Sequence, residues 1–178
     1  MNLKKLKIIA SISIFLLCFL THFGYDIMPS IITSFFFPVN ESIFEHLKMI
    51  YTTVVIWSII EYFIIKKLNL ITHNKVFNIW ISGILNIFIF LIIYLPIRHI
   101  FGEQMILTFI ILFISICLTQ FISYHTLINK DILNNKISLI LVICTFILFA
   151  YFTYNPLHTY LFYDTQDSIY GIPKEKDH

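Results

Sequence analysis

Side chains that can bind a metal or transfer a proton occur where the apolar segments of this sequence begin or end. His22 closes the first apolar run, and His158 follows the last one. The stretch PVNESIFEHLK, between the first two runs, adds two glutamates and a histidine. A zinc site needs three or four converging ligands, with one position open if the metal is catalytic. The candidate ligands of zinc or another divalent metal are His22, His46, His158 and Asp164, with Glu45 as an alternative to Asp164, and the candidate general bases are Glu41 and Glu45.

These residue types predict hydrolysis of an ester or phosphoester. A bound metal lowers the pKa of water to about 7, and a nearby carboxylate can accept the proton that the water loses. The spacing contains neither an HExxH nor an HxxxH pattern. The hypothesis therefore depends on whether these residues meet at one end of the molecule.

Helix capping is an alternative explanation for part of PVNESIFEHLK. Ser42 and Glu45 match the S-x-x-E capping box, in which each side chain accepts a hydrogen bond from the other residue's backbone N–H. Acidic residues in the first turn also suit the positive end of the helix dipole. Capping explains neither Glu41 nor His46. These two residues are either part of a polar site or part of a polar surface beside the membrane.

The composition is that of an integral membrane protein. The chain has 178 residues, of which 58% are hydrophobic and 12% charged, and its mean hydropathy is +0.85. Soluble domains carry about 25% charged residues. The net charge of +2 does not suggest a nucleic-acid partner, so the expected partners are the lipid bilayer and a lipid substrate. The three cysteines lie singly in apolar runs, which argues against a disulfide framework or a thiolate metal site.

Five apolar runs are long enough to cross a membrane, because about 20 helical residues span the hydrocarbon core. Helices satisfy their own backbone hydrogen bonds in lipid, whereas open strands do not. The sequence therefore predicts an all-α bundle forming one transmembrane domain over residues 1–173, with a disordered end at 174–178. Loop 24–40 and the C-terminal tail are expected to form an extracytoplasmic cap. The predicted helices cover about 6–23, 43–65, 76–97, 105–124 and 137–154.

The distribution of lysine and arginine predicts the orientation, because cytoplasmic loops carry an excess of both. With five spans, eight of the 12 basic residues lie on the side of the N-terminus. We therefore expect a multi-pass protein of the cell membrane with a cytoplasmic N-terminus and an extracytoplasmic C-terminus. Eight of the ten acidic residues then lie outside, and the exceptions are Glu61 and Asp131. Glu61 is close to Lys66 in sequence, which predicts an ion pair near the inner membrane surface.

Two polar segments resemble a family of small, uncharacterised bacterial multi-pass membrane proteins that is classed only as a domain of unknown function. The first segment is NESIFEHLK, which runs from Asn40 to Lys48. In the second segment, NPLHTYLFYDTQDSIYG, the matching residues are Pro156, His158, Leu161, Phe162, Asp164, Tyr170 and Gly171. The resemblance covers nearly the whole chain. It implies a small integral membrane protein and brings no established activity.

Two functions remain open on this reasoning. The histidines and acids gathered on one side favour a membrane-embedded, metal-dependent hydrolase of lipid or lipid-linked substrates. The alternative is a non-enzymatic small transporter, or an accessory or immunity-type membrane subunit. In that case the outer polar groups are caps and ion pairs that share no pocket. The two hypotheses differ in geometry, since only the first requires the candidate ligands to converge.

Overall fold

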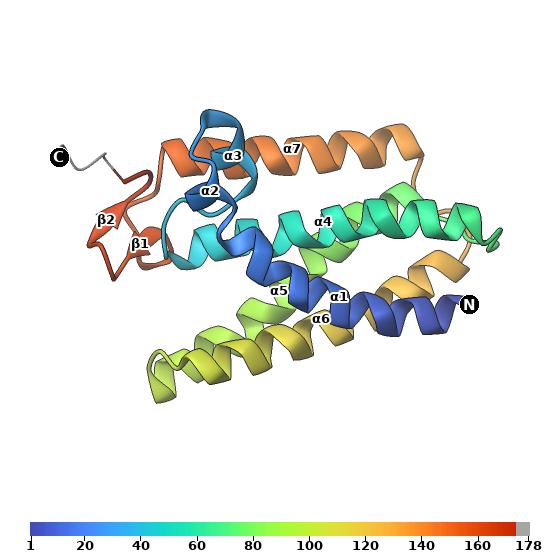
Figure 1. Cartoon of the computed structure of the whole chain (residues 1–178), viewed down its shortest axis with the longest axis horizontal. Helices are drawn as coiled ribbons and strands as arrows, with labels where there is room; N and C mark the ends of the chain where they lie inside the picture. The colour runs from blue at the N-terminus through green and yellow to red at the C-terminus, as the bar shows by residue number, and fades with distance from the viewer. Residues whose placement is uncertain (174–178) are drawn as a thin grey trace.

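The computed structural model describes residues 1–173 as a bundle of long helices with a small cap at one end (Figure 1). The long helices are α1 (Leu3–His22), α4 (Ile43–Lys67), α5 (Lys75–Phe101), α6 (Met105–Ile128) and α7 (Asn135–Tyr154). The short elements are α2 (Gly24–Ile27), α3 (Ile31–Phe36), the 3-10 turn η1 (Tyr160–Phe162), β1 (Tyr163–Asp164) and β2 (Ile169–Tyr170). The predicted helical membrane-protein fold is confirmed. The end predicted to be disordered, residues 174–178, lies outside the described part of the chain.

Four helices within residues 1–173, α4 to α7, are long and apolar enough to cross a membrane. The predicted count of five spans is therefore not exact, because α1 is not among them. α1 begins at Leu3, earlier than expected, so Lys4, Lys5 and Lys7 lie inside the helix. α1 nevertheless packs against α4 and α6. Its outward side chains are apolar, namely Ile8, Ile12, Leu16 and Leu20.

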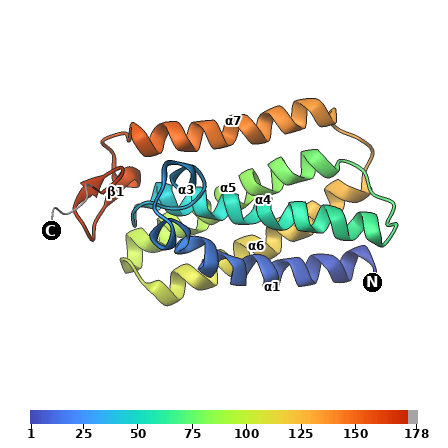
Figure 2. The ribbon, with the colours of Figure 1, turned by 45° about the horizontal axis from the view of Figure 1, so that its top comes forward.

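The bundle is polar inside and apolar outside. α5 contacts α4, α6 and α7, and α1 fills the space beside α4 and α6 (Figure 2). The buried side chains include Ser82, Asn86, Ser115 and Thr119, whereas many isoleucines and phenylalanines are exposed. This distribution suits a lipid solvent, in which helices associate through small residues and interhelical hydrogen bonds.

Local sequence explains where several helices begin and end. Asn2 caps α1 by accepting a hydrogen bond from the N–H of Lys5, and Asn134 caps α7 through the N–H of Lys136. α5 ends at Gly102, whose φ of +72° lies in the region that favours glycine. The helix therefore continues beyond residue 97, the predicted end. Arg98 consequently belongs to the last turn of α5 and not to the loop.

The predicted cap of loop and tail is present at the end of the bundle opposite the N-terminus (Figure 1). We call this the cap end. α3 packs against α7, and the hydroxyls of Ser34 and Tyr154 are 2.8 Å apart. The side chain of Asn40 donates a 2.7 Å hydrogen bond to the carbonyl of Gly171, which joins the loop to the tail. β1 and β2 pair as an antiparallel ladder within that tail.

Glu61 lies inside the bundle, and its predicted pairing with Lys66 is wrong. Glu61 Oε2 is 2.7 Å from Lys7 Nζ, and both side chains are almost fully buried. Lys66 is exposed. Lys7 reaches Glu61 because α1 packs against α4, a contact between segments that are 54 residues apart in sequence.

Candidate metal centre at the mouth of an apolar pocket

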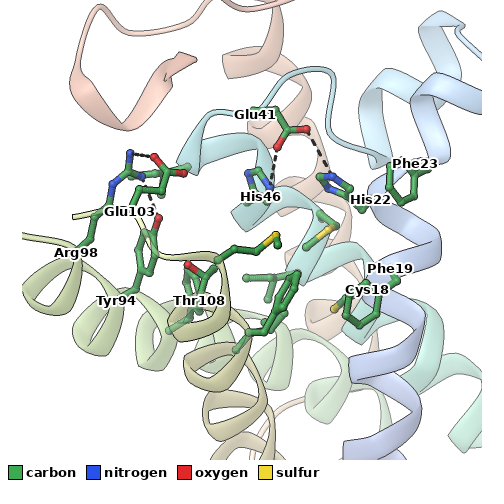
Figure 3. A pocket seen from close by; sticks show the side chains of 17 residues that line it. Cys18, Phe19, His22, Phe23, Glu41, His46, Tyr94, Arg98, Glu103 and Thr108 are labelled. Atoms are coloured by element: carbon green, nitrogen blue, oxygen red, sulfur yellow. Dashed lines mark hydrogen bonds and ion pairs between the residues drawn. The ribbon is translucent and has the colours of Figure 1, made fainter. Parts of the chain in front are cut away.

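His22, Glu41 and His46 meet at the cap end (Figure 3). The two oxygens of Glu41 lie 3.5 Å from His22 Nε2 and 3.4 Å from His46 Nε2. One ligand atom from each residue lies within 4.8 Å of the other two. Two ligands at about 2.0–2.1 Å from one zinc ion in a tetrahedron are roughly 3.4 Å apart. Small side-chain rotations would therefore bring all three atoms onto one ion.

A backbone contact sets the protonation of His46. Its Nδ1 lies 2.9 Å from the carbonyl oxygen of Ser42, in the turn that starts α4. A carbonyl oxygen only accepts, so Nδ1 carries the hydrogen. In the neutral ring Nε2 then holds the lone pair. Metal-binding histidines are commonly oriented in this way, with the other ring nitrogen donating to a carbonyl or carboxylate.

His22 is the last residue of α1, outside the four candidate spans. Its ring stacks on that of His46, with centroids 5.3 Å apart and planes inclined by 30°. Burial lowers the pKa of His22; the nearby Glu41 carboxylate opposes this effect, and His46 adds to it. The lowered pKa favours the neutral imidazole, which is the form that binds metals.

Glu41 is held in place by the C-terminal tail. It lies just before α4, and its backbone N–H donates a 2.9 Å hydrogen bond to Asp164 Oδ2. The Asp164 side chain is fully buried and also accepts from the backbone of Gln166 and Asp167. The tail therefore positions the carboxylate that lies between the two histidines.

The three residues stand at the mouth of a cavity of about 450 Å³ between α1, α4, α5 and α6. Drug-sized ligand pockets are about 300–1,000 Å³. Most of the wall is apolar, and its largest side chains are Phe19, Ile50, Phe90, Phe109 and Leu112. Figure 3 shows the polar residues above this apolar wall. The cavity can therefore hold an apolar group with a polar end at the mouth.

A second polar group lies across the mouth from the histidines (Figure 3). Arg98 donates a 2.9 Å hydrogen bond to the hydroxyl of Tyr94 and forms a 2.7 Å ion pair with Glu103. Its guanidinium also lies 5.0 Å from the centre of the Tyr160 ring. The Arg98 side chain is 13% exposed, whereas that of Glu103 is 55% exposed. Arg98 is thus fixed from several sides, and Glu103 is its most loosely held partner.

Two of the predicted ligands lie elsewhere. His158 is exposed, and its ring lies 4.6 Å from that of Tyr170 in the tail. Asp164 acts on the site only through the backbone of Glu41. Within the described residues, neither belongs to the group of converging ligand atoms. We therefore leave both out of the ligand set proposed below.

Glu45, a predicted general base, is buried in a structural network. Its carboxylate accepts from the N–H of Val39 at 3.1 Å and from the hydroxyl of Thr153 at 2.7 Å. It also pairs with Lys48. The capping box is half confirmed, because Ser42 accepts from the Glu45 N–H at 3.4 Å. The expected return bond is wrong, since Asn40 takes the N–H of Ser42.

The group around Arg98 was missed in the sequence because its helix was expected to end at residue 97. Tyr94 and Arg98 are four residues apart, and this spacing brings side chains together on a helix. A longer α5 would have predicted their contact. The opposing position of His22 depends on the packing of α1 and has no local signal.

Residues 1–172 match the model of a family of unknown function, DUF6512. No curated protein and no solved structure matches the chain.

Proposed function

The chain belongs to the DUF6512 family, whose function is unknown, and we propose from its site that it is a membrane-embedded, metal-dependent hydrolase of lipid or lipid-linked substrates. The metal is zinc or another divalent ion bound by His22, Glu41 and His46. One observation carries the proposal. Two imidazoles and a carboxylate converge at the mouth of an apolar pocket.

The ligand set is of a catalytic kind. Two histidines and one glutamate occur in catalytic zinc sites, where the fourth position is left for water or substrate. All three residues line the pocket, so that position would face a bound substrate. Glu41 is then a ligand and not the general base suggested by its sequence.

A metal at this position would supply hydroxide at neutral pH. In the hydrolysis, the water oxygen bonds to the acyl or phosphoryl centre, and the bond from that centre to the leaving oxygen breaks. The proton of the water passes to the leaving oxygen. His46 contributes by holding its Nε2 lone pair toward the site through the Nδ1–H bond to Ser42. The apolar wall supports a substrate with a hydrocarbon portion.

The transporter alternative is favoured by one different observation. Lys7 Nζ contacts Glu61, Gln120 and Ser123 in a buried polar cluster. Glu61 Oε1 is buried without a hydrogen-bond partner, and Lys7 and Gln120 border a second cavity of about 780 Å³. Transporters bind their substrates near the midplane. We favour the hydrolase because converging ligand atoms point to a specific bound species, whereas the Lys7–Glu61 pair already neutralises itself.

The proposed location is the cell membrane, with the N-terminus in the cytoplasm and the cap end outside. The unequal distribution of lysine and arginine supports this orientation. The proposed hydrolysis would then occur at the outer membrane surface.

The test is metal binding by the purified full-length protein. After chelation and dialysis, zinc titration of the unmodified protein should give about one bound ion. His46→Ala and Glu41→Gln should each weaken binding at least tenfold, because each removes one of three ligands. His99→Ala is the matched control, since His99 is an exposed histidine in the last turn of α5 at the same end. Equal zinc binding by His46→Ala and the unmodified protein would overturn the proposal.

A further inference from the structure

We propose that Arg98 and Tyr94 form an anion subsite, and that the pocket binds an amphiphile with an apolar tail and a phosphate-bearing headgroup. This inference deepens the proposed function and rests on it in taking the pocket as the substrate site. It specifies what the substrate carries besides the bond to be cleaved. Its evidence comes from the wall opposite the candidate metal ligands.

Arg98 is prepared to bind an oxyanion. The guanidinium presents a planar fork of donors that matches phosphate oxygens in pairs. Tyr94 and Tyr160 hold this fork in place, and burial leaves the Arg98 side chain 13% exposed. Little side-chain freedom remains to be lost when an anion binds, which favours binding.

Glu103 occupies the position that the anion would take. Its carboxylate lies 2.7 Å from Arg98 Nη2, but its side chain is 55% exposed. Ion pairs with an exposed partner contribute little to stability, typically about 0–1 kcal/mol. A phosphate can therefore replace Glu103 on Arg98 while Glu103 turns toward water. The carboxylate then acts as a weak internal competitor.

The position of the subsite relates the headgroup to the candidate metal. Arg98 and the group of His22, Glu41 and His46 face the same cavity from opposite sides of its mouth (Figure 3). The phenylalanine-rich wall lies below both. An amphiphile with its tail against that wall and its phosphate on Arg98 would carry its linking ester between the two polar groups.

The experiment measures binding to full-length, metal-free protein in detergent by titration calorimetry. The probes are a monoacyl phosphate, the monoacylglycerol with the same chain, and inorganic phosphate. The monoacyl phosphate should bind at least tenfold more tightly than either of the others, because only this probe uses both the wall and Arg98. Equal affinity for the monoacylglycerol would overturn the anion subsite. Equal affinity for inorganic phosphate would overturn the role of the apolar wall.

Two variants assign the effect to Arg98. Arg98→Gln should weaken binding of the monoacyl phosphate about tenfold or more and leave monoacylglycerol binding unchanged, which also shows that the pocket is folded. Glu103→Gln should tighten binding of the monoacyl phosphate severalfold, because it removes the competing charge. If neither variant changes phosphate selectivity, the inference is wrong. If Arg98→Gln does not fold, a Glu103→Gln variant with unchanged affinity is sufficient to reject it.

The result separates this inference from the proposed function. Selectivity for the monoacyl phosphate in protein that fails to bind zinc supports the subsite and rejects the hydrolase. Zinc binding with no dependence of lipid affinity on Arg98 or Glu103 rejects the subsite alone.

Discussion

Two glutamates four residues apart have opposite environments. Glu41 lies before α4, with a 39% exposed side chain between two histidines. Glu45 lies inside the first turn of α4 with a 2% exposed side chain, and its oxygens are occupied by Val39, Lys48 and Thr153. The start of the helix separates them, because it turns Glu45 toward α7 and leaves Glu41 at the mouth of the pocket. At the residue scale, Glu41 is the candidate for chemistry and Glu45 the candidate for stability.

Replacing Glu45 tests this assignment. Glu45→Gln leaves the buried Lys48 ammonium without its counter-charge, and breaking a buried ion pair costs about 3–5 kcal/mol. We expect a clear fall in the midpoint of thermal unfolding in detergent, with zinc affinity retained in the folded fraction. Lys48→Met combined with Glu45→Gln removes the unpaired charge and should recover part of the loss. Unchanged stability in the single variant, together with lost zinc binding, would instead assign Glu45 to the metal site.

At the scale of elements, the crossing of α4 and α5 depends on a glycine. Gly83 of α5 packs directly on the ring of Tyr51 in α4. A Cβ placed at residue 83 would lie 2.5 Å from Tyr51 Cδ2. The Tyr51 side chain is fully buried and packs on Phe146 and Phe149 of α7. The glycine therefore sets how closely three of the candidate spans approach one another.

Gly83→Ala should destabilise the bundle by about 1–3 kcal/mol, the usual cost of overpacking a core. Alanine favours a helix over glycine by about 1 kcal/mol, so a net loss would show that the steric overlap dominates. Thermal unfolding in detergent measures the effect. Phe88→Ala on the same helix is the control, because Phe88 is 58% exposed and should change stability little. A more stable Gly83→Ala variant would mean that α4 and α5 separate without cost.

At the scale of the whole molecule, the two ends of the bundle differ. The cap end contains the candidate metal ligands, the ion pair of Arg98 and the hairpin of the tail. At the opposite end, Asn74 links two loops by donating hydrogen bonds to the carbonyls of Thr126, Asn129 and Lys130. The candidate chemistry thus belongs to one membrane surface, and the orientation decides which compartment supplies the water.

Cysteine labelling on intact cells tests the proposed orientation. The background replaces Cys18, Cys117 and Cys144 by alanine. Gln166→Cys places a thiol in the exposed tail, and Lys130→Cys places one in the exposed loop at the opposite end. A membrane-impermeant maleimide should label only the first variant, whereas both should react after permeabilisation. The reverse pattern would place the cap end in the cytoplasm.

The sequence by itself determined the membrane character, the approximate helices and the cap. Long apolar runs can satisfy their backbones in lipid only as helices, and local capping by Ser42 needs only neighbouring residues. The sequence also placed His22, Glu41 and His46 at one end, since each adjoins an end of an apolar run. The inward turn of Lys7 was not predictable, because its partner Glu61 comes from another helix.

Only the tertiary structure decided which polar residues meet. His158 and Asp164 adjoin the last apolar run just as His22 adjoins the first, yet the tail folds so that Asp164 holds the backbone of Glu41 and His158 packs on Tyr170. Arg98 joined the pocket because α5 continues to Phe101. Shared sidedness in a sequence fixes the height of a residue along the bundle. The direction in which its side chain points depends on helix packing, and helix packing is set by contacts between distant segments.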